Sequence, residues 1–164
     1  IMRDIFNDAW QNNWGFVPLA EADWEETVKT LIKLMPDDYI QIAEFDGEPA
    51  AFIVALPNIN EAARDLNGSL LPFGWAKLLW RLKVRHPRTA RIPLMGVRRE
   101  FQQSRLGPTL AFLVIDAVRK ALHANGVEDV EMGWILEDNM GMRNIIETIG
   151  GEAYKRYRVY EKEL

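Results

Sequence analysis

The chain has 164 residues, of which 48% are hydrophobic and 27% charged, which are ordinary values for a globular protein with a full-sized core. It contains no cysteine and two histidines far apart in sequence, so disulfides, thiolate metal sites and thiol nucleophiles are excluded and a structural zinc site is not expected. The net charge of −4 argues against a general nucleic-acid binder, which needs a basic face to release counterions.

No stretch of the sequence approaches the roughly 20 apolar residues that span a bilayer, and the first residues lack the pattern of a signal peptide. We therefore expect no transmembrane segment and a cytoplasmic protein. The length predicts a single domain over residues 1–164. Because Ile1 is not a start methionine, this domain is compatible with a part of a longer protein.

Two helices are predicted at the start of the chain. Ile1–Trp10 is periodic in apolar residues, and Glu21–Leu34 carries an apolar stripe that consists of Trp24, Val28, Leu31 and Ile32. The loop between the helices contains Trp14 and Phe16. Their large apolar surfaces are expected to pack on another part of the protein.

A β-hairpin is predicted next. Two β-rich runs, Tyr39–Phe45 and Ala50–Leu56, flank the pair Asp46-Gly47, a turn sequence that favours positive φ. Such a pair of strands must be antiparallel.

The segment 57–90 is long for a connection, and such connections are often functional or form interfaces. It contains a predicted helix near Glu61–Leu66 and an apolar patch over Leu70–Trp75. A basic amphipathic helix is predicted over Trp75–Val84.

The second half of the chain alternates strands and helices. The predicted elements are a strand Arg91–Val97, a helix Pro108–Asn125, a strand Val127–Ile135, a helix capped by Asn139 and stopped by Gly150, and a closing strand Tyr154–Glu161. The strand–helix–strand unit from 91 to 135 requires parallel pairing. Together with the hairpin, it predicts a mixed sheet.

The segment Val97–Leu110, with the sequence VRREFQQSRLGPTL, joins a predicted strand to a predicted helix. A polar turn with a glycine in this place leaves backbone N–H groups unpaired and directed at one spot, which suits a phosphate group. Residues 77–105 carry nine basic residues against one acid, Glu100, so positive potential is expected around the turn. A solvated surface is the alternative interpretation of these charges.

The residue order of this segment resembles the acyl-CoA loop of the GNAT superfamily, the acyl-CoA-dependent N-acyltransferases, whose signature is Gln/Arg-x-x-Gly-x-Gly/Ala. Gln102 and Gly107 fill the first and last places, and Arg105 stands at the middle glycine. The segment Asn139–Gly151 resembles the family's later pattern Asn-x-x-Ala-x-x-Leu-Tyr-x-x-x-Gly-Phe. Asn139, Ile145 and Gly150 match it, whereas Met142, Ile146 and Gly151 depart from it.

The order of predicted elements also follows the family order over nearly the whole chain. The resemblance therefore implies an α/β (α+β) fold with a mixed, mostly antiparallel sheet flanked by helices and a helical insertion, 57–90, between the third and fourth strands. In this family CoA lies between two diverging strands, with its pyrophosphate on the loop before the helix. The implied co-substrate is acetyl-CoA or a longer acyl-CoA, without a metal.

By the same resemblance, the CoA-binding residues are Val97, Gln102, Gln103, Ser104, Arg105, Leu106, Gly107, Pro108, Thr109 and Asn139. Backbone N–H groups make most contacts in such loops, so side chains can vary. Arg105 leaves two alternatives: it points outward and adds a contact to a phosphate, or it crowds the site and marks a lost cofactor function.

Acylation requires a neutral amine, so a carboxylate should lie near the thioester carbonyl. Glu137 and Asp138, at the end of a predicted strand, are the first candidates, with Glu100 behind them; the alternative role of both is to cap the helix that starts at Asn139. Many family members have a tyrosine, thought to protonate the leaving thiolate, where this chain has Ile146. Tyr154 is the candidate substitute, and Tyr157 and Tyr160 are alternatives; packing would explain all three tyrosines as well.

The resemblance implies an N-acyltransferase, in the first instance an N-acetyltransferase, that acts on a small-molecule or peptide amine. A backbone N–H near Val97 and Arg98 would polarise the thioester carbonyl. Substrate selection is assigned to Trp14, Phe16, Phe73 and Trp75, whose apolar character suggests an apolar acyl chain or amine. Packing in the core is the alternative explanation of these side chains. The alternative function is a non-catalytic GNAT-like module that binds acyl-CoA or a protein, with the apolar insertion as an interface, for example in a homodimer.

Overall fold

A four-stranded sheet forms the centre of the fold in the computed structural model, which describes residues 1–162. Its strands, in spatial order, are β1 (Ile40–Phe45), β2 (Glu48–Pro57), β3 (Thr89–Val97) and β4 (Asp129–Met132). The first two pairs are antiparallel and β3 pairs with β4 in parallel. The mixed, mostly antiparallel sheet is therefore confirmed, and the chain divides into two units, Ile1–Trp134 and a second that starts at Ile135.

The hairpin turn between β1 and β2 follows from its two residues. Asp46 and Gly47 have φ values of 52° and 82°, the left-handed conformations that a two-residue turn requires to match the twist of the strands. Strand β2 is central, and Ala50–Ala55 are at most 3% exposed. Its apolar run, rather than an alternating pattern, reflects coverage of both faces of the sheet.

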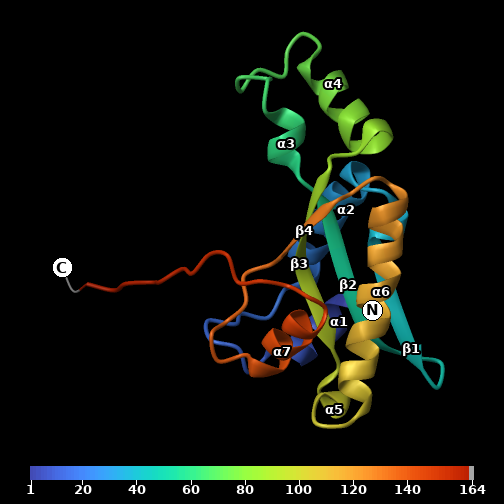
Figure 1. Cartoon of the computed structure of the whole chain (residues 1–164), viewed down its shortest axis with the longest axis vertical. Coiled ribbons are helices and arrows are strands. Elements are labelled where there is room, and N and C mark those ends of the chain that lie inside the picture. The colour runs from blue at the N-terminus through green and yellow to red at the C-terminus, as the bar shows by residue number, and fades with distance from the viewer. Residues whose placement is uncertain (163–164) are drawn as a thin grey trace. The chain divides into compact units, whose positions relative to one another are not determined.

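Helices cover the two faces of this sheet in the first unit (Figure 1). Helix α1 (Met2–Trp10) and helix α2 (Glu21–Leu34) lie on one face, and helix α6 (Leu106–Ala124) lies on the other, where it crosses β1 and β2. Glycine is needed under α1, because a Cβ atom on Gly96 would lie 2.8 Å from the Phe52 ring and 3.3 Å from Ala9 Cβ. A short 3₁₀ turn, η1 (Asp37–Tyr39), leads into β1.

The insertion leaves the sheet at the end of β2 and returns at the start of β3, so it lies between the second and third strands, not between the third and fourth as predicted. It consists of α3 (Ile59–Ala63), α4 (Gly74–Trp80) and a wide helical turn, η2 (Arg81–Arg85). Asn58 caps α3, because its side chain accepts hydrogen bonds from the backbone N–H groups of Asn60 and Glu61. The predicted helix near Glu61–Leu66 therefore begins and ends earlier than expected.

Three further elements differ from the sequence prediction. A one-turn helix, α5 (Arg99–Gln102), interrupts the segment that was predicted as an open loop. Strand β4 is four residues long and ends at Met132 instead of Ile135. Residues 151–162 contain neither helix nor strand, so the predicted closing strand Tyr154–Glu161 is wrong.

The second unit contains helix α7 (Met140–Thr148). The Asn139 side chain accepts a hydrogen bond from the Met142 backbone N–H at 3.1 Å, which confirms Asn139 as its N-cap. Gly150 ends the helix with a φ of 87°, a left-handed conformation that glycine adopts without strain. The two units are described separately below.

Candidate functional site

Strand β3 extends beyond its parallel neighbour. The last pair between β3 and β4 joins Ile92 to Met132, whereas β3 continues to Val97. Gly133 follows with a φ of 26°, and a Cβ atom there would lie 2.7 Å from the Ile92 carbonyl oxygen. Glycine therefore allows β4 to end against β3, and within residues 1–162 one edge of β3 has no strand partner beyond Ile92.

The backbone groups on this free edge follow from the ladder on the other side. Arg98 N donates to Ala50 O at 2.8 Å, so in the antiparallel alternation the N–H groups of Val97 and Met95 point away from β2. Two carbonyls on that edge already have partners: Trp10 Nε1 donates to Met95 O at 2.9 Å, and Gln102 Nε2 donates to Val97 O at 2.8 Å. The Arg98 N–H group is therefore occupied and does not serve a ligand, contrary to the prediction. The Val97 N–H group points to the free edge, which is the direction that the predicted role requires.

The turn between β3 and α6 is largely closed by its own hydrogen bonds. Ser104 Oγ accepts from Leu106 N at 3.1 Å, and Ser104 O accepts from Gly107 N at 3.3 Å. Pro108 has no N–H group. The expectation that these first amides of α6 are unpaired is therefore wrong in this conformation, because Ser104 occupies two of them.

Gly107 is needed for the packing of the turn on itself. A Cβ atom at this position would lie 2.6 Å from Phe101 O and 3.2 Å from Gln102 Cα, both atoms of α5. Residues Gln103 and Arg105 are exposed on the outside of the turn, as is Thr109, whose Oγ1 donates to Arg105 O at 3.1 Å.

The basic residues predicted to surround this turn separate into two groups. Arg98, Arg99 and Arg105 lie at the turn; Arg98 Nε donates to Pro49 O at 2.6 Å, and the other two side chains are exposed. The remaining six lie on the insertion and the first residues of β3: Lys77, Arg81, Lys83, Arg85, Arg88 and Arg91. Since β3 continues for six residues beyond Arg91, or about 20 Å, these six charges are remote from the turn.

The first-choice catalytic residues, Glu137, Asp138 and Tyr154, lie in the second unit, whereas Glu100, the further candidate, lies in α5 of the first unit. Glu137 accepts from Arg158 Nη1 at 3.3 Å through its carboxylate and from Arg143 Nη1 at 2.9 Å through its backbone carbonyl. The Asp138 carbonyl accepts from Met140 N at 2.8 Å, and Tyr154 is 64% exposed with Lys155 Nζ 4.8 Å from its ring centroid. Their catalytic roles, and the CoA contact assigned to Asn139, stay predictions.

The predicted substrate-binding residues lie in two separate segments of the first unit, the loop between α1 and α2 and the start of α4. Trp14 is 70% exposed, whereas the Phe16 ring packs against Phe6 with centroids 5.8 Å apart. Phe73 and Trp75 are 76% and 51% exposed at the start of α4. Figure 1 shows α3 and α4 at the end of the unit opposite α5, so the insertion does not adjoin the turn before α6.

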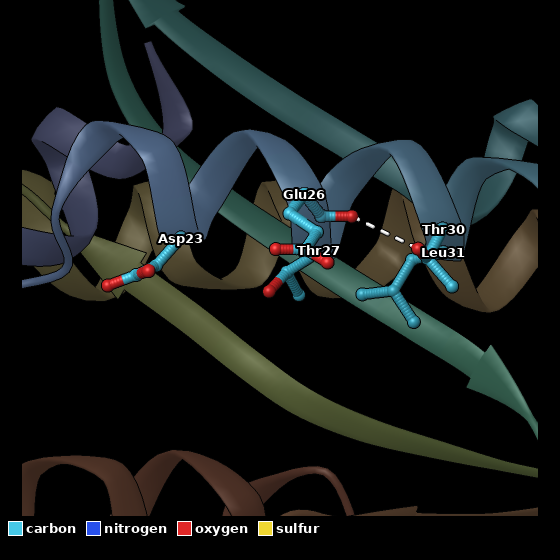
Figure 2. Close-up of a pocket in the computed structure, with 5 residues that line it drawn as sticks. All are labelled: Asp23, Glu26, Thr27, Thr30 and Leu31. Carbon is cyan, nitrogen blue, oxygen red and sulfur yellow. Dashed lines mark hydrogen bonds between the residues drawn. The ribbon is translucent and has the colours of Figure 1, made fainter.

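Helix α2 has two different sides, which the sequence pattern only partly revealed. Its outer side forms an open groove with a hydrogen bond of 3.1 Å from Thr30 Oγ1 to Glu26 O (Figure 2); the groove is lined by Asp23, Glu26, Thr27, Thr30 and Leu31. Its inner side bounds a small cavity that is almost entirely apolar and is lined by Met2, Trp24, Thr27, Val28, Leu31, Met35, Ile40, Val54 and Leu94. Ile32, predicted on the buried stripe, is 44% exposed instead.

Within residues 1–162, no group of three or more His, Asp or Glu side chains is placed to hold a metal ion. The same residues form no helix that is long and apolar enough to cross a bilayer.

Curated proteins match the chain along nearly its full length. It is 60% identical over 164 residues to Protein YghO of Escherichia coli (strain K12) and 49% identical over 163 residues to the bacterial ceramide synthase of Caulobacter vibrioides (strain NA1000 / CB15N). The chain spans 42% of the length of each of these relatives. No protein-family model matches it.

Solved structures of N-acetyltransferases share the fold. Aminoglycoside N-acetyltransferase AAC(6')-Iy, in complex with a bisubstrate analogue of CoA, has a TM-score of 0.58 at 15% identity, covering 99% of this chain and 89% of its own. Ribosomal-protein-alanine N-acetyltransferase from Brucella melitensis biovar Abortus 2308 has a TM-score of 0.52 at 13% identity, covering 98% and 91%. The chain therefore has the GNAT fold, as its motifs implied.

Proposed function

We propose that this chain is the acyl-CoA-binding part of an N-acyltransferase. The observation that carries the proposal is the free edge of β3 beyond Ile92, which ends in a turn that leads directly into α6. In a GNAT fold this arrangement offers backbone donors to the amides of a CoA molecule and a helix N-terminus to its phosphates.

The free edge supplies the electrostatic part of the reaction. The pantetheine arm of acyl-CoA would add to β3 like a short strand, with Met95 N–H and Val97 N–H as donors on that side. One such donor, placed at the thioester carbonyl, would stabilise the negative charge that develops on its oxygen. The amine nitrogen attacks the carbonyl carbon, the C–N bond forms, and the C–S bond breaks to release CoA.

Proton transfer completes this scheme. The attacking amine loses a proton, for which Glu137 or Asp138 is the proposed acceptor, and the leaving thiolate gains one, for which Tyr154 is the proposed donor.

Phosphate binding requires a rearrangement of Ser104. Its hydroxyl and carbonyl now hold Leu106 N–H and Gly107 N–H, so a pyrophosphate would have to replace them as acceptor. Arg99 and Arg105 are exposed at the same turn and add charge-assisted contacts. A Ser104→Ala variant should therefore bind CoA at least as well as the wild type, which a thermal-shift titration measures.

A long-chain amine is the proposed acceptor. The relative from Caulobacter vibrioides is named a ceramide synthase, and a ceramide is the N-acyl amide of a long-chain amino alcohol.

A non-catalytic acyl-CoA- or protein-binding module is the second candidate function. Arg105 at the place of a glycine and Ile146 at the place of a tyrosine favour it, together with the closed turn. This candidate predicts CoA-induced stabilisation without turnover.

Release of the CoA thiol tests the proposal. Acetyl-CoA and palmitoyl-CoA are combined with ethanolamine, sphinganine and an aminoglycoside, and we expect turnover to be fastest with sphinganine. Val97→Pro removes one N–H group that points away from the β2 ladder, so the fold should persist while kcat/KM falls by about 10²-fold. Ile42→Pro is the matched control, since its N–H faces outward on the other edge strand, β1, and turnover should be unchanged.

Three outcomes separate the candidates. Thiol release that Val97→Pro abolishes and Ile42→Pro spares supports the transferase. Stabilisation by CoA without thiol release identifies the binding module. If acetyl-CoA and palmitoyl-CoA neither stabilise the chain nor release thiol, the assignment of the β3 edge to acyl-CoA is wrong.

A further inference from the structure

The insertion ends in an apolar surface that the transferase scheme does not use. Seven large apolar side chains are exposed on it, between 38% and 78%: Leu70, Leu71, Phe73, Trp75, Leu79, Trp80 and Val84. We call these residues the insertion tip. Trp75 and Leu79, like Trp80 and Val84, are four residues apart, so each pair shares a side of the helical segment that α4 and η2 form.

The insertion is held in place by polar contacts behind the tip. Arg81 binds the Asp65 carboxylate and the Ala62 carbonyl, and Lys77 binds the same carboxylate. The Arg81 guanidinium, with Lys77, holds the pKa of Asp65 well below its ordinary value. These contacts join α3 and the segment after it to α4 and η2, which carry Trp75, Leu79, Trp80 and Val84, whereas Leu70, Leu71 and Phe73 lie in the loop before α4.

A second anchor joins the insertion to the body of the first unit. Lys83 Nζ donates to Met35 O at 2.9 Å and to Ile32 O at 3.3 Å, at the C-terminal end of α2. A lysine is favourable there because the last carbonyls of a helix carry partial negative charge. The tip therefore lies at a fixed end of the unit, as Figure 1 shows for α3 and α4.

The charge of the insertion is opposite to that of the chain. Residues 57–90 contain six basic residues and two acidic ones, whereas the whole chain has a net charge of −4. Of the five basic residues between Gly74 and Arg88, Lys77 and Arg81 pair with Asp65 and Arg88 pairs with Glu128, so Lys83 and Arg85 carry the excess of positive charge. Arg85 is exposed directly beside Val84, and Lys77 is exposed between Trp75 and Leu79.

We propose that the insertion tip docks on the surface of a bilayer that contains anionic phospholipids. Exposed tryptophan, phenylalanine and leucine side chains beside lysine and arginine are the combination that enters the headgroup region and its acyl boundary. Each basic residue near an anionic membrane contributes about 1 kcal/mol, or roughly fivefold in binding. The basic excess favours this occupant over a second copy of the chain, since two such surfaces would repel each other.

The proposal concerns adsorption to the surface and is independent of acyl transfer. The docking surface and the free edge of β3 lie at opposite ends of β3, so substitution of one leaves the other intact. Loss of membrane binding and loss of transferase activity are therefore distinguishable by separate variants.

Co-sedimentation with vesicles tests the proposal. The chain is mixed with vesicles of phosphatidylcholine alone or with about one third phosphatidylglycerol, at low and high salt. We expect sedimentation with the anionic vesicles only, weakened by salt. Phe73→Ser combined with Trp80→Ser should reduce the partition coefficient at least tenfold, and Arg85→Glu should reduce it about 25-fold because it changes two units of charge.

Matched variants control for fold and for non-specific effects. Trp134→Ser removes a tryptophan that is 67% exposed outside the insertion, and Arg119→Glu reverses an exposed charge on α6; neither should alter sedimentation. Circular dichroism verifies that each variant is folded. Absence of binding to anionic vesicles, or equal binding of the double variant, overturns the proposal. Dimerisation of the wild type that the double variant abolishes, without vesicle binding, would instead assign the tip to self-association.

Discussion

At the scale of single residues, the carboxylate of Glu61 joins the insertion to the sheet. Its oxygens accept from Arg88 N at 2.9 Å, from Thr89 N at 3.0 Å and from Thr89 Oγ1 at 2.6 Å. Burial alone would raise the pKa of Glu61, but the hydrogen bonds from Thr89 and Arg88 outweigh it and lower the pKa. The first residues of β3 therefore depend on an ionised side chain in α3.

This arrangement predicts a pH-dependent loss of stability. Because the folded pKa is below the unfolded one, the contribution is present above the unfolded pKa, about 4.3, and is lost as the pH falls through the folded value. Glu61→Gln should lower the melting temperature at pH 7, and the difference from the wild type should shrink below about pH 4. Thermal unfolding from pH 3 to 8 measures it, with the exposed Glu26→Gln as control. A difference that is independent of pH would contradict the role of the charge.

The close packing of Gly107 on α5 leads to a second prediction at this scale. Because its Cβ would meet the backbone of α5 at 2.6 Å, Gly107→Ala must displace the turn before α6, at a cost of about 1–3 kcal/mol. The stabilisation by added CoA should fall as well. Gly141→Ala is the control, since a Cβ there meets only Asn139 Oδ1 at 3.9 Å. Unchanged CoA-induced stabilisation in Gly107→Ala would remove the turn from the binding site.

Local chemistry could be predicted at single positions, whereas partners distant in sequence could not. Asn139 as a cap and Asp46-Gly47 as a turn follow from each residue and its neighbours, and both predictions are confirmed. The role of Arg98 N–H depends on the register between β2 and β3, which places Ala50 O opposite it. The sequence pattern does not encode that register, so the prediction named the N–H groups near Val97 and Arg98 without distinguishing between them.

At the scale of elements, Asn58 has two tasks at the base of the insertion. Its Oδ1 caps α3, and its Nδ2 donates to Thr89 Oγ1 at 2.8 Å on β3. Asn58→Ala should therefore destabilise the first unit by about 1–2 kcal/mol. Asn60→Ala, an exposed substitution in the same helix, should have an effect within about 0.5 kcal/mol. Chemical denaturation compares the two; equal losses would contradict the capping role.

Elements that are marked by local sequence periodicity were predicted correctly. Elements that depend on packing against a distant part of the chain were not. The bounds of α2 and the existence of α6 follow from apolar periodicity. Tyr154–Glu161 has β-branched and aromatic residues, but such residues favour a strand only where a pleated, half-buried surface receives them. Residues 151–162 are exposed almost throughout, which explains why this propensity is not realised.

At the scale of the whole molecule, the first unit separates two surfaces along the length of β3. The free edge and the turn before α6 lie at one end, and the insertion tip lies at the other. From the sequence, all nine basic residues of 77–105 are expected around one turn, because they are close together along the chain. Closeness in sequence does not imply closeness in space here. The part of β3 from Arg91 to Val97, about 20 Å long, separates the charges into two groups.

Amide hydrogen exchange of the chain with and without palmitoyl-CoA tests the central claim most directly. Binding along β3 should slow exchange in peptides that cover Leu94–Thr109, because ligand and loop then share hydrogen bonds, and should leave Leu70–Arg85 unchanged. Protection confined to the insertion, or no protection in either segment at saturating ligand, would contradict the assignment of the β3 edge to acyl-CoA.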